Sequence, residues 1–305
     1  DQTHVTFQKG ARLVGIPPPN FRVIRTSAAS GYGLTADAVR AAVDRDVARG
    51  LVPLYLCATV GTTGLGAVDP VRELGEEARR RGMWLHVDAA YAGSAAICQE
   101  FQELLDGVEL ADSVSMNPHK WFLTNMDCCC LWVASPRALT SALSTDPEYL
   151  RNVGTGGGGA AVDYKDWQIS LSRRFRAIKL WVVLRRYGAD GLRAHIRRHV
   201  AAAKWFERAV TVDERFEVVV PRKLSLVCFR LRERFPEDDA VDDLNRELLA
   251  AVNESGQAFM THFVVDGKFV IRLAVGGAMT EMKHVMDVWE LLQGKAEEVL
   301  RRHQL

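Results

Sequence analysis

The stretch that decides the fold is His86-Val87-Asp88-Ala89-Ala90-Tyr91, together with Ser115-Met116-Asn117-Pro118-His119-Lys120-Trp121. The residues from 84 to 87 predict a short buried strand, which places the Asp88 carboxylate where a parallel strand would end. The carboxyl ends of such strands are the usual ligand site of open α/β sheets. The second segment places Lys120 between an imidazole and an indole, where partial desolvation would weaken its preference for the ammonium form.

Taken separately, both residues have a purely structural interpretation. Asp88 could cap a following helix, and Lys120 could be a surface lysine whose stem packs on its neighbours. Together they make the pair that pyridoxal phosphate (PLP) requires, namely a carboxylate that keeps the pyridinium nitrogen protonated and an amine that condenses with the aldehyde. The pair therefore predicts a PLP site.

Both segments resemble those of the PLP-dependent aromatic L-amino-acid decarboxylases, the group II decarboxylases of fold type I, and are most similar to the plant tyrosine and tryptophan decarboxylases. The resemblance runs the length of the chain. It implies that Lys120 bonds the cofactor, that Asp88 contacts the pyridinium and that Ala90 lies against one ring face. His4 matches the histidine that stacks on the other face.

Three more residues take a role from the same resemblance. Thr63 lies in the Gly61-Thr62-Thr63-Gly64 loop, after an apolar run, and is expected beside the PLP ring. Asn117 is expected to help bind the phosphate, and His119 to lie between the cofactor and a mobile loop. An amide donor suits a phosphate, and histidine moves protons near neutral pH. Without the resemblance, the loop and His119 would be interpreted as structural.

Substrate and reaction depend on residues later in the chain. Tyr149 matches the loop tyrosine that protonates the substrate carbon after carbon dioxide leaves, which favours amine formation over the aldehyde synthesis found where Phe occupies that position. The glycine-rich segment 146–163 is compatible with a linker or a lid. Ser172 matches a pocket position at which serine accompanies phenolic substrates. Arg272 lies in an apolar strand and either pairs with a buried carboxylate or binds the substrate carboxylate.

The order of apolar segments predicts an α/β protein of PLP fold type I. Strands alternating with helices in residues 1–178 predict a mainly parallel sheet in a large PLP-binding domain. Residues 179–305 predict a small α+β C-terminal domain with a hairpin at Asp266-Gly267. A long helical region from Ala177 to Ala209, interrupted at Gly188 and Gly191, is expected to lead into it. Within the large domain, Asp69 is expected to cap a helix that ends at Gly82.

Composition limits the partners. The net charge of +1, from 39 basic and 38 acidic residues, gives no sign of nucleic acid or membrane binding, and no run could span a bilayer. The triplet Cys128-Cys129-Cys130 lacks metal-ligand spacing, so we expect strand positions, no metal and a reducing, cytoplasmic location. The expected partners are an aromatic amino acid and a second copy in a homodimer.

The sequence predicts a carboxy-lyase that converts tyrosine or Dopa to a monoamine such as tyramine. The alternatives are a tryptophan decarboxylase, an aromatic aldehyde synthase and a non-catalytic fragment that only dimerises with a complete protomer. The last remains open because the related decarboxylases have an upstream stretch with a Ser/Gly-rich phosphate loop that this sequence does not contain. We therefore expect the chain to be the later part of a longer enzyme.

Overall fold

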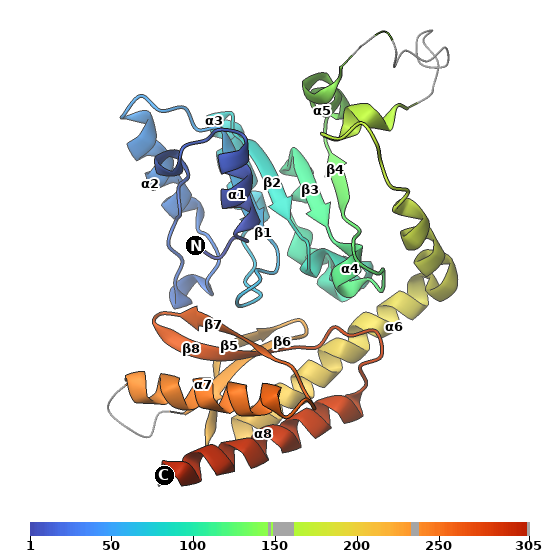
Figure 1. The fold of residues 1–305 in the computed structure, drawn as a ribbon. Helices are drawn as coiled ribbons and strands as arrows, with labels where there is room; N and C mark the ends of the chain where they lie inside the picture. Colours follow the sequence, from blue (N-terminus) through green and yellow to red (C-terminus); the bar gives the residue numbers. More distant parts are fainter. Residues whose placement is uncertain (146–147, 149–161, 233–237, 304–305) are drawn as a thin grey trace.

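The computed structural model describes residues 1–145, 148, 162–232 and 238–303. These residues form two four-stranded sheets, each with its own helices, and a long kinked helix joins them (Figure 1). The first sheet lies in the N-terminal half of the chain and the second in the last third. We call the two parts the large unit and the small unit.

The sheet of the large unit is mainly parallel, as predicted. Its strands are β1 (Tyr55–Thr59), β2 (Trp84–Asp88), β3 (Ser113–Met116) and β4 (Cys130–Val133), in the order β1-β2-β3-β4. The pairs β1/β2 and β2/β3 are parallel, whereas β4 runs antiparallel to β3 at the edge. Three parallel strands bring their carboxyl ends to one edge of the sheet.

Helices α2 (Ala36–Val47) and α3 (Val71–Arg81) cover one face of this sheet, and α1 (Thr6–Leu13) lies over the other (Figure 1). Leu85 and Val87 of β2 belong to the core on the α2/α3 side. Because side chains alternate along a strand, Trp84, His86 and Asp88 point to the opposite face.

The start of α3 differs from the prediction. Its N-cap residue is Pro70, and the Asp69 carboxylate instead accepts hydrogen bonds from the backbone N–H groups of Leu34 and Thr59, both at 2.7 Å. Asp69 is only 4% exposed, so these bonds compensate for its burial. The carboxylate joins the end of β1 to the segment before α2 rather than capping a helix.

The remaining elements of the large unit are short. They are the α-helices α4 (Pro118–Trp121) and α5 (Pro136–Leu143) and the 3-10 helices Pro18–Asn20, Ala28–Ser30, Ala92–Ile97, Gln99–Leu105, Val108–Leu110 and Tyr164–Trp167. Of the three consecutive cysteines, only Cys130 lies in a strand, so the strand prediction is wrong for Cys128 and Cys129.

Helix α6 (Ala177–Val212) connects the units and is broken at Gly188, whose φ of 63° and ψ of 177° are not helical. The predicted interruption at Gly188 is confirmed, whereas the backbone at Gly191 is helical. All the buried residues of α6 follow the kink, from Leu192 onward. The domain boundary after residue 178 remains a prediction.

The small unit is an antiparallel sheet backed by helices, the predicted α+β arrangement. Its elements are β5 (Phe216–Lys223), β6 (Leu226–Leu231), α7 (Asp238–Glu254), β7 (Thr261–Val265), β8 (Lys268–Ala274) and α8 (Met282–Arg302), with strand order β5-β6-β8-β7. The β7–β8 hairpin turns at Asp266-Gly267, as predicted, with φ of 50° and 81°. The core of the small unit is built around Phe206, Phe229 and Trp289.

The other face of the small sheet packs on the large unit. Leu65 and Ala67, in the loop after β1, share an apolar cluster with Leu226 and Val270. A Cβ added to Gly64 would lie 2.6 Å from the Phe263 ring, so only glycine allows this approach. The loop after β1 is therefore fixed between the two units.

Candidate active site

The segments that follow β2 and β3 lie side by side. Asp88 is in register with Ser115. Beyond the strand ends, the Ala89 N–H donates to the Ser115 carbonyl at 2.9 Å, and the Asn117 N–H donates to the Ala90 carbonyl at 3.1 Å. This backbone ladder brings the two sequence motifs together at the carboxyl edge of the parallel sheet.

Asp88 is buried, with 7% of its surface exposed. Its Oδ1 accepts a hydrogen bond from the Ala90 N–H at 3.0 Å, and among the described residues no hydrogen bond reaches Oδ2. One carboxylate oxygen is therefore available to hold a proton on a ligand nitrogen.

His86 lies two residues before Asp88 on the same strand face, and the sequence analysis gave it no role. Its Nδ1 lies 2.8 Å from Ser113 Oγ, and its Nε2 lies 3.2 Å from Ser115 Oγ. Burial lowers the pKa of His86, while the nearby Asp88 carboxylate opposes that effect. The imidazole is thus neutral at pH 7, and the i, i+2 spacing in the sequence was the signal that could have placed it beside Asp88.

Lys120 lies on α4, a helix of four residues. Its side chain is exposed and makes no hydrogen bond or ion pair with any residue in the described ranges. The expected partial desolvation is therefore wrong for this structure. Trp121, the next residue, is 1% exposed, because neighbouring residues of so short a helix point in different directions and the indole takes the core side.

His4 and Thr63 are both exposed. His4 Nδ1 accepts a hydrogen bond from the Thr6 N–H at 3.2 Å, just before α1. Phe7 of α1 lies 5.5 Å from the His86 ring, which puts this part of the chain on the sheet face of Asp88. Thr63 follows β1 at the same sheet edge. His4 therefore lies just before a helix on the sheet face of Asp88, Thr63 lies in the loop after β1, and their roles at a ring remain predictions.

Asn117 and His119 flank the start of α4. Asn117 Oδ1 is buried without a hydrogen-bond partner in the described part of the chain. His119 Nδ1 lies 2.7 Å from the carbonyl oxygen of Cys128 and 3.1 Å from its N–H nitrogen. The His119 ring is therefore tied to the backbone that follows α4, and the predicted cofactor roles of both residues remain predictions.

Arg272 holds the loop after β1. Its Nε donates to the Gly64 carbonyl at 2.7 Å, one Nη donates to the Thr63 carbonyl, and the other donates to Thr261 Oγ1 at 2.8 Å. Burial lowers the pKa of Arg272. The alternative of a buried carboxylate partner is wrong for the described residues, because neutral oxygens satisfy this guanidinium. A contact with a substrate carboxylate remains a prediction.

Ser172 and Tyr149 are the residues predicted to set the substrate and the reaction. Ser172 is exposed, and its backbone carbonyl accepts a hydrogen bond from Gln168 Nε2 at 2.9 Å. Tyr149 lies outside the described residues, as does most of the glycine-rich segment 146–163. The substrate and proton-donor predictions thus remain predictions.

Cys129, which was predicted to lie in a strand, precedes β4. Burial and the Asp88 carboxylate raise the pKa of the Cys129 thiol, and Lys120 lowers it. Cys130, the next residue, pairs with Met116 at the carboxyl end of β3, so Cys129 lies at the sheet edge where the segments of Asp88 and Lys120 begin.

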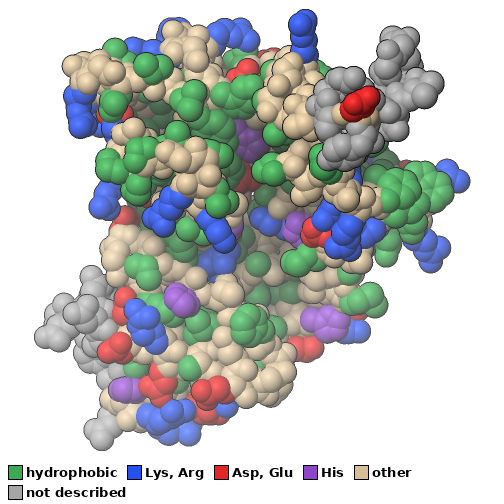
Figure 2. Space-filling model, turned by 45° about the horizontal axis from the view of Figure 1, so that its top comes forward, with side chains coloured by type: hydrophobic (Ala, Val, Ile, Leu, Met, Phe, Trp, Pro, Cys, Tyr) green, Lys and Arg blue, Asp and Glu red, His purple; other side chains and the backbone are tan. Residues whose placement is uncertain are grey.

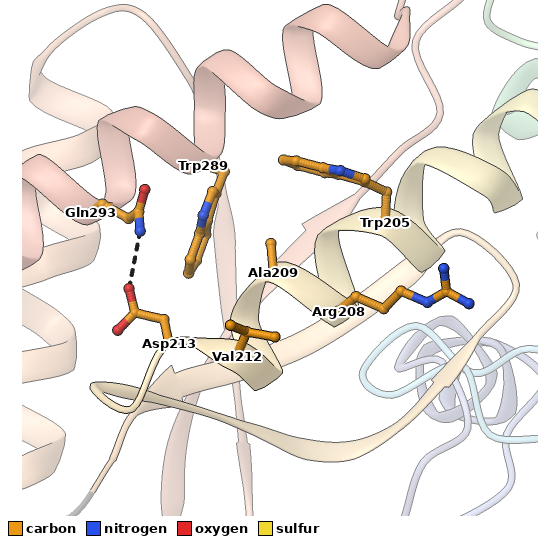
Figure 3. Close-up of a pocket in the computed structure, with 7 residues that line it drawn as sticks. All are labelled: Trp205, Arg208, Ala209, Val212, Asp213, Trp289 and Gln293. Carbon is orange, nitrogen blue, oxygen red and sulfur yellow. Dashed lines mark hydrogen bonds between the residues drawn. The ribbon is translucent and has the colours of Figure 1, made fainter.

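The molecular surface agrees with an open site. Figure 2 shows the large unit hollowed between its helical part and its β4 side, with histidine and acidic side chains visible inside. A separate pocket of about 460 Å³ lies between α6 and α8 of the small unit, lined by Trp205, Trp289 and Val212, with Asp213 bonded to Gln293 at 3.1 Å (Figure 3). It contains none of the predicted site residues.

Residues 1–232 match the pyridoxal-dependent decarboxylase conserved domain. The chain belongs to this family. L-tyrosine/L-DOPA decarboxylase 2 of Lophophora williamsii is 51% identical over 99% of the chain, and a phenylacetaldehyde synthase of a Rosa hybrid cultivar is 52% identical over 98%. The chain spans 61% and 60% of the length of these two proteins.

A solved structure has the same fold. The Oryza sativa TDC, in complex with PLP and tryptamine, superposes with a TM-score of 0.95 at 50% identity, covering 97% of this chain and 61% of that one. The fold and family predictions are confirmed, and so is PLP as the cofactor of the family. Within the described ranges, no helix has the length and apolar character needed to cross a membrane, and no group of three His, Cys, Asp or Glu side chains could hold a metal.

The residues present fit this cofactor. The Asp88 carboxylate has an oxygen without a hydrogen bond, and the Lys120 amine has no partner among the described residues. The two lie after neighbouring parallel strands, on segments joined by backbone hydrogen bonds. An anionic acceptor for a pyridinium and a primary amine for an aldehyde are the two groups that PLP needs.

Proposed function

We propose that this chain carries the PLP site of an aromatic L-amino-acid decarboxylase that converts L-tyrosine or L-Dopa to the monoamine and carbon dioxide. The observation that carries the proposal is the placement of Asp88 and Lys120 on adjacent segments at the carboxyl ends of β2 and β3. The similarity to an L-tyrosine/L-DOPA decarboxylase supports the phenolic substrate.

The chemistry divides between cofactor and chain. When bound, PLP supplies an electron sink for the bond to the leaving carboxylate. Lys120 would bond to the aldehyde until the substrate amine displaces it. Asp88 would keep the ring nitrogen protonated, and its burial strengthens that interaction. Ala90 and His4 would contact the two ring faces.

The return of a proton to the substrate carbon determines whether the product is an amine or an aldehyde. Tyr149 is our proposed donor to the substrate carbon. The rival reaction is that of an aromatic aldehyde synthase, which a phenylacetaldehyde synthase at 52% identity brings into consideration. Incubation with L-tyrosine should give tyramine and carbon dioxide without ammonia or peroxide. Ammonia and peroxide in amounts equal to the carbon dioxide would assign the synthase instead.

The cofactor site has a direct test. The chain is incubated with PLP, reduced with borohydride and digested, and the peptides are mapped by mass spectrometry. We expect the label on Lys120. Lys9, an exposed lysine of α1, is the internal control in the same digest. A label spread over surface lysines, with Lys120 unmodified, would remove the proposed site.

Substrate preference has its own test. We expect L-tyrosine and L-Dopa to be decarboxylated faster than L-tryptophan, and Ser172→Gly to shift the preference toward tryptophan because it removes a hydroxyl and adds room. The kcat/KM ratio for the two amino acids is the measurement. Faster turnover of tryptophan by the unmodified chain would assign the tryptophan decarboxylase alternative.

We further propose a homodimer in the cytoplasm, with residues 1–178 and 179–305 as domains. Apolar side chains on β4 and on the start of α6 support a partner: Leu131, Trp132 and Trp181 are 52%, 54% and 58% exposed. Analytical ultracentrifugation should show a dimer at micromolar concentration. A chain that stays monomeric, and dimerises only when a complete protomer is added, would support the non-catalytic fragment.

A further inference from the structure

An aromatic pair lies directly behind the two cofactor segments. Tyr91 follows Ala90, and Trp121 follows Lys120. The two rings stack with centroids 5.0 Å apart and planes 22° apart, and Trp121 is 1% exposed. Ala90 and Lys120, which are both proposed to touch the cofactor, are thus each one position away from a packed aromatic ring.

Tyr91 is hydrogen-bonded to the small unit, and Trp121 to the connecting helix α6. Tyr91 Oη lies 2.7 Å from Ser225 Oγ and accepts from the Ser225 N–H at 3.2 Å, in the turn between β5 and β6. The Trp121 indole N–H donates to His199 Nδ1 on α6 at 3.0 Å. Figure 1 shows α4 beside α6, where this bond crosses between the units.

The hydrogen bond from Trp121 determines which ring nitrogen of His199 carries the proton. The ring is 1% exposed, and burial lowers its pKa more strongly than a backbone interaction with Thr280 raises it, so it is neutral. Because Nδ1 accepts the indole hydrogen, the proton of the neutral ring must be on Nε2. His195, one turn earlier and 4.2 Å away, is equally buried, but neither of its nitrogens has a partner among the described residues.

Helix α4 is held by the backbone bond from Asn117 to Ala90, by the contact of His119 with the Cys128 backbone and by the packing of Trp121. It is four residues long, and no side chain caps its N-terminus. The Lys120 amine makes no hydrogen bond with the described residues, so its direction depends on the helix backbone. That backbone is anchored through the buried indole of the next residue.

We propose that His199 is a positioning residue for Lys120, acting through the Trp121 indole. The inference rests on the proposed function, because it takes Lys120 as the lysine that bonds PLP. It also gives the small unit a role in the site of the large unit, since a shift of α6 would turn α4.

The test measures the initial rate at which PLP and borohydride label Lys120, per folded molecule, with the folded fraction taken from circular dichroism. We expect His199→Leu to label about tenfold more slowly, because a misdirected amine loses the geometry that speeds bond formation. His199→Gln can still accept the indole hydrogen and should recover most of the rate. His195→Leu is the matched control, equally buried on the same helix, and should label at the rate of the unmodified chain.

Trp121→Phe provides a second line if His199→Leu folds poorly. This variant keeps a ring against Tyr91 but removes the indole donor, so it should slow labelling of Lys120 to a similar extent. The double variant with His199→Gln should label no more slowly than Trp121→Phe alone. Equal labelling rates in His199→Leu and the unmodified chain would overturn the positioning role. So would equal slowing in the His195→Leu control. A label that avoids Lys120 in the unmodified chain would instead overturn the proposed function, and this inference with it.

Discussion

Strands β4 and β6 have similar apolar sequences and antiparallel neighbours, yet only one of them is buried. All six residues of β6 are buried, whereas Leu131 and Trp132 of β4 are 52% and 54% exposed. β6 lies between β5 and β8, with the helix core on one face and the loop after β1 on the other. β4 forms the edge of its sheet. An apolar strand is therefore buried by its place in the tertiary structure and not by its composition alone.

The two units differ in the same way, because the site edge of the large unit is exposed and the core of the small unit is buried. The site edge of the large unit leaves Lys120 and Thr63 exposed, whereas the small unit packs Phe206, Phe229 and Trp289 into a closed core. Changes at the open edge should alter chemistry without altering stability, and changes in the closed core should do the reverse. The four predictions below test this contrast, from the largest expected effect to the smallest.

Replacing the lysine should abolish the reaction. For Lys120→Ala we expect amine formation from L-tyrosine to fall by at least about 10³-fold, because the covalent attachment of the cofactor is lost. The urea midpoint should be unchanged, since the side chain is exposed. Lys9→Ala is the control and should keep full activity. An Lys120→Ala chain that retains a tenth of the activity would show that another group bonds the cofactor.

Emptying the closed core should destabilise the fold. Phe229 is 0% exposed and packs on Phe206 with centroids 5.2 Å apart. We expect Phe229→Ala to lower the free energy of unfolding by about 3–5 kcal/mol, through lost burial and a residual cavity. Urea denaturation measures it, with Val264→Ala on the exposed side of β7 as a control expected within about 0.5 kcal/mol. A small effect at Phe229 would mean that the core is not closed.

An ion pair beside the small-unit pocket should make stability depend on pH. Arg215 lowers the pKa of Asp213 from 3.8 to about 2. Because the folded pKa lies below the unfolded one, the stabilisation is fully present above pH 4 and is lost as the pH falls toward 2. With solvent screening, Asp213→Asn should cost about 1 kcal/mol at pH 7 and progressively less below pH 4.

The control for this ion pair is Asp190→Asn, because Asp190 also pairs with an arginine but its side chain is 98% exposed. Its unfolding free energy should follow that of the unmodified chain at every pH. A pH-independent cost of Asp213→Asn would assign the effect to the hydrogen bond with Gln293 instead of to the charge.

The smallest expected effect on folding is at the exposed edge strand. Trp132→Ser should change the unfolding free energy of the monomer by less than about 0.5 kcal/mol, because the indole is half exposed. It should, however, weaken the proposed dimer in sedimentation experiments. Val212→Ser, 82% exposed at the end of α6, should leave association unchanged. Equal association of both variants would place the dimer contact elsewhere.

Local patterns were sufficient for much of the fold. An apolar run predicted β2, a glycine predicted the interruption of α6 at Gly188, and a two-residue turn predicted the β7–β8 hairpin. The strand-end rule placed Asp88 and Lys120 on one edge. These features depend on periodicity and on the conformation of neighbouring residues, which a sequence displays directly.

Other features involve partners distant in the sequence. Asp69 bonds Leu34 across 35 positions, Trp121 bonds His199 across 78, and Arg272 bonds Gly64 across 208. No local pattern specifies such a pair, so a helix cap was expected at Asp69 and a carboxylate partner at Arg272.

The sequence by itself determined the strand that ends at Asp88, the family to which the chain belongs, and Asp88 and Lys120 as the predicted acid and amine of the site. Only the tertiary structure decided that Lys120 is exposed while Trp121 is buried, and that the Trp121 indole bonds His199 on α6. The physical reason is that side-chain type and spacing are written along the chain, whereas burial and hydrogen-bond partners arise when distant segments pack together.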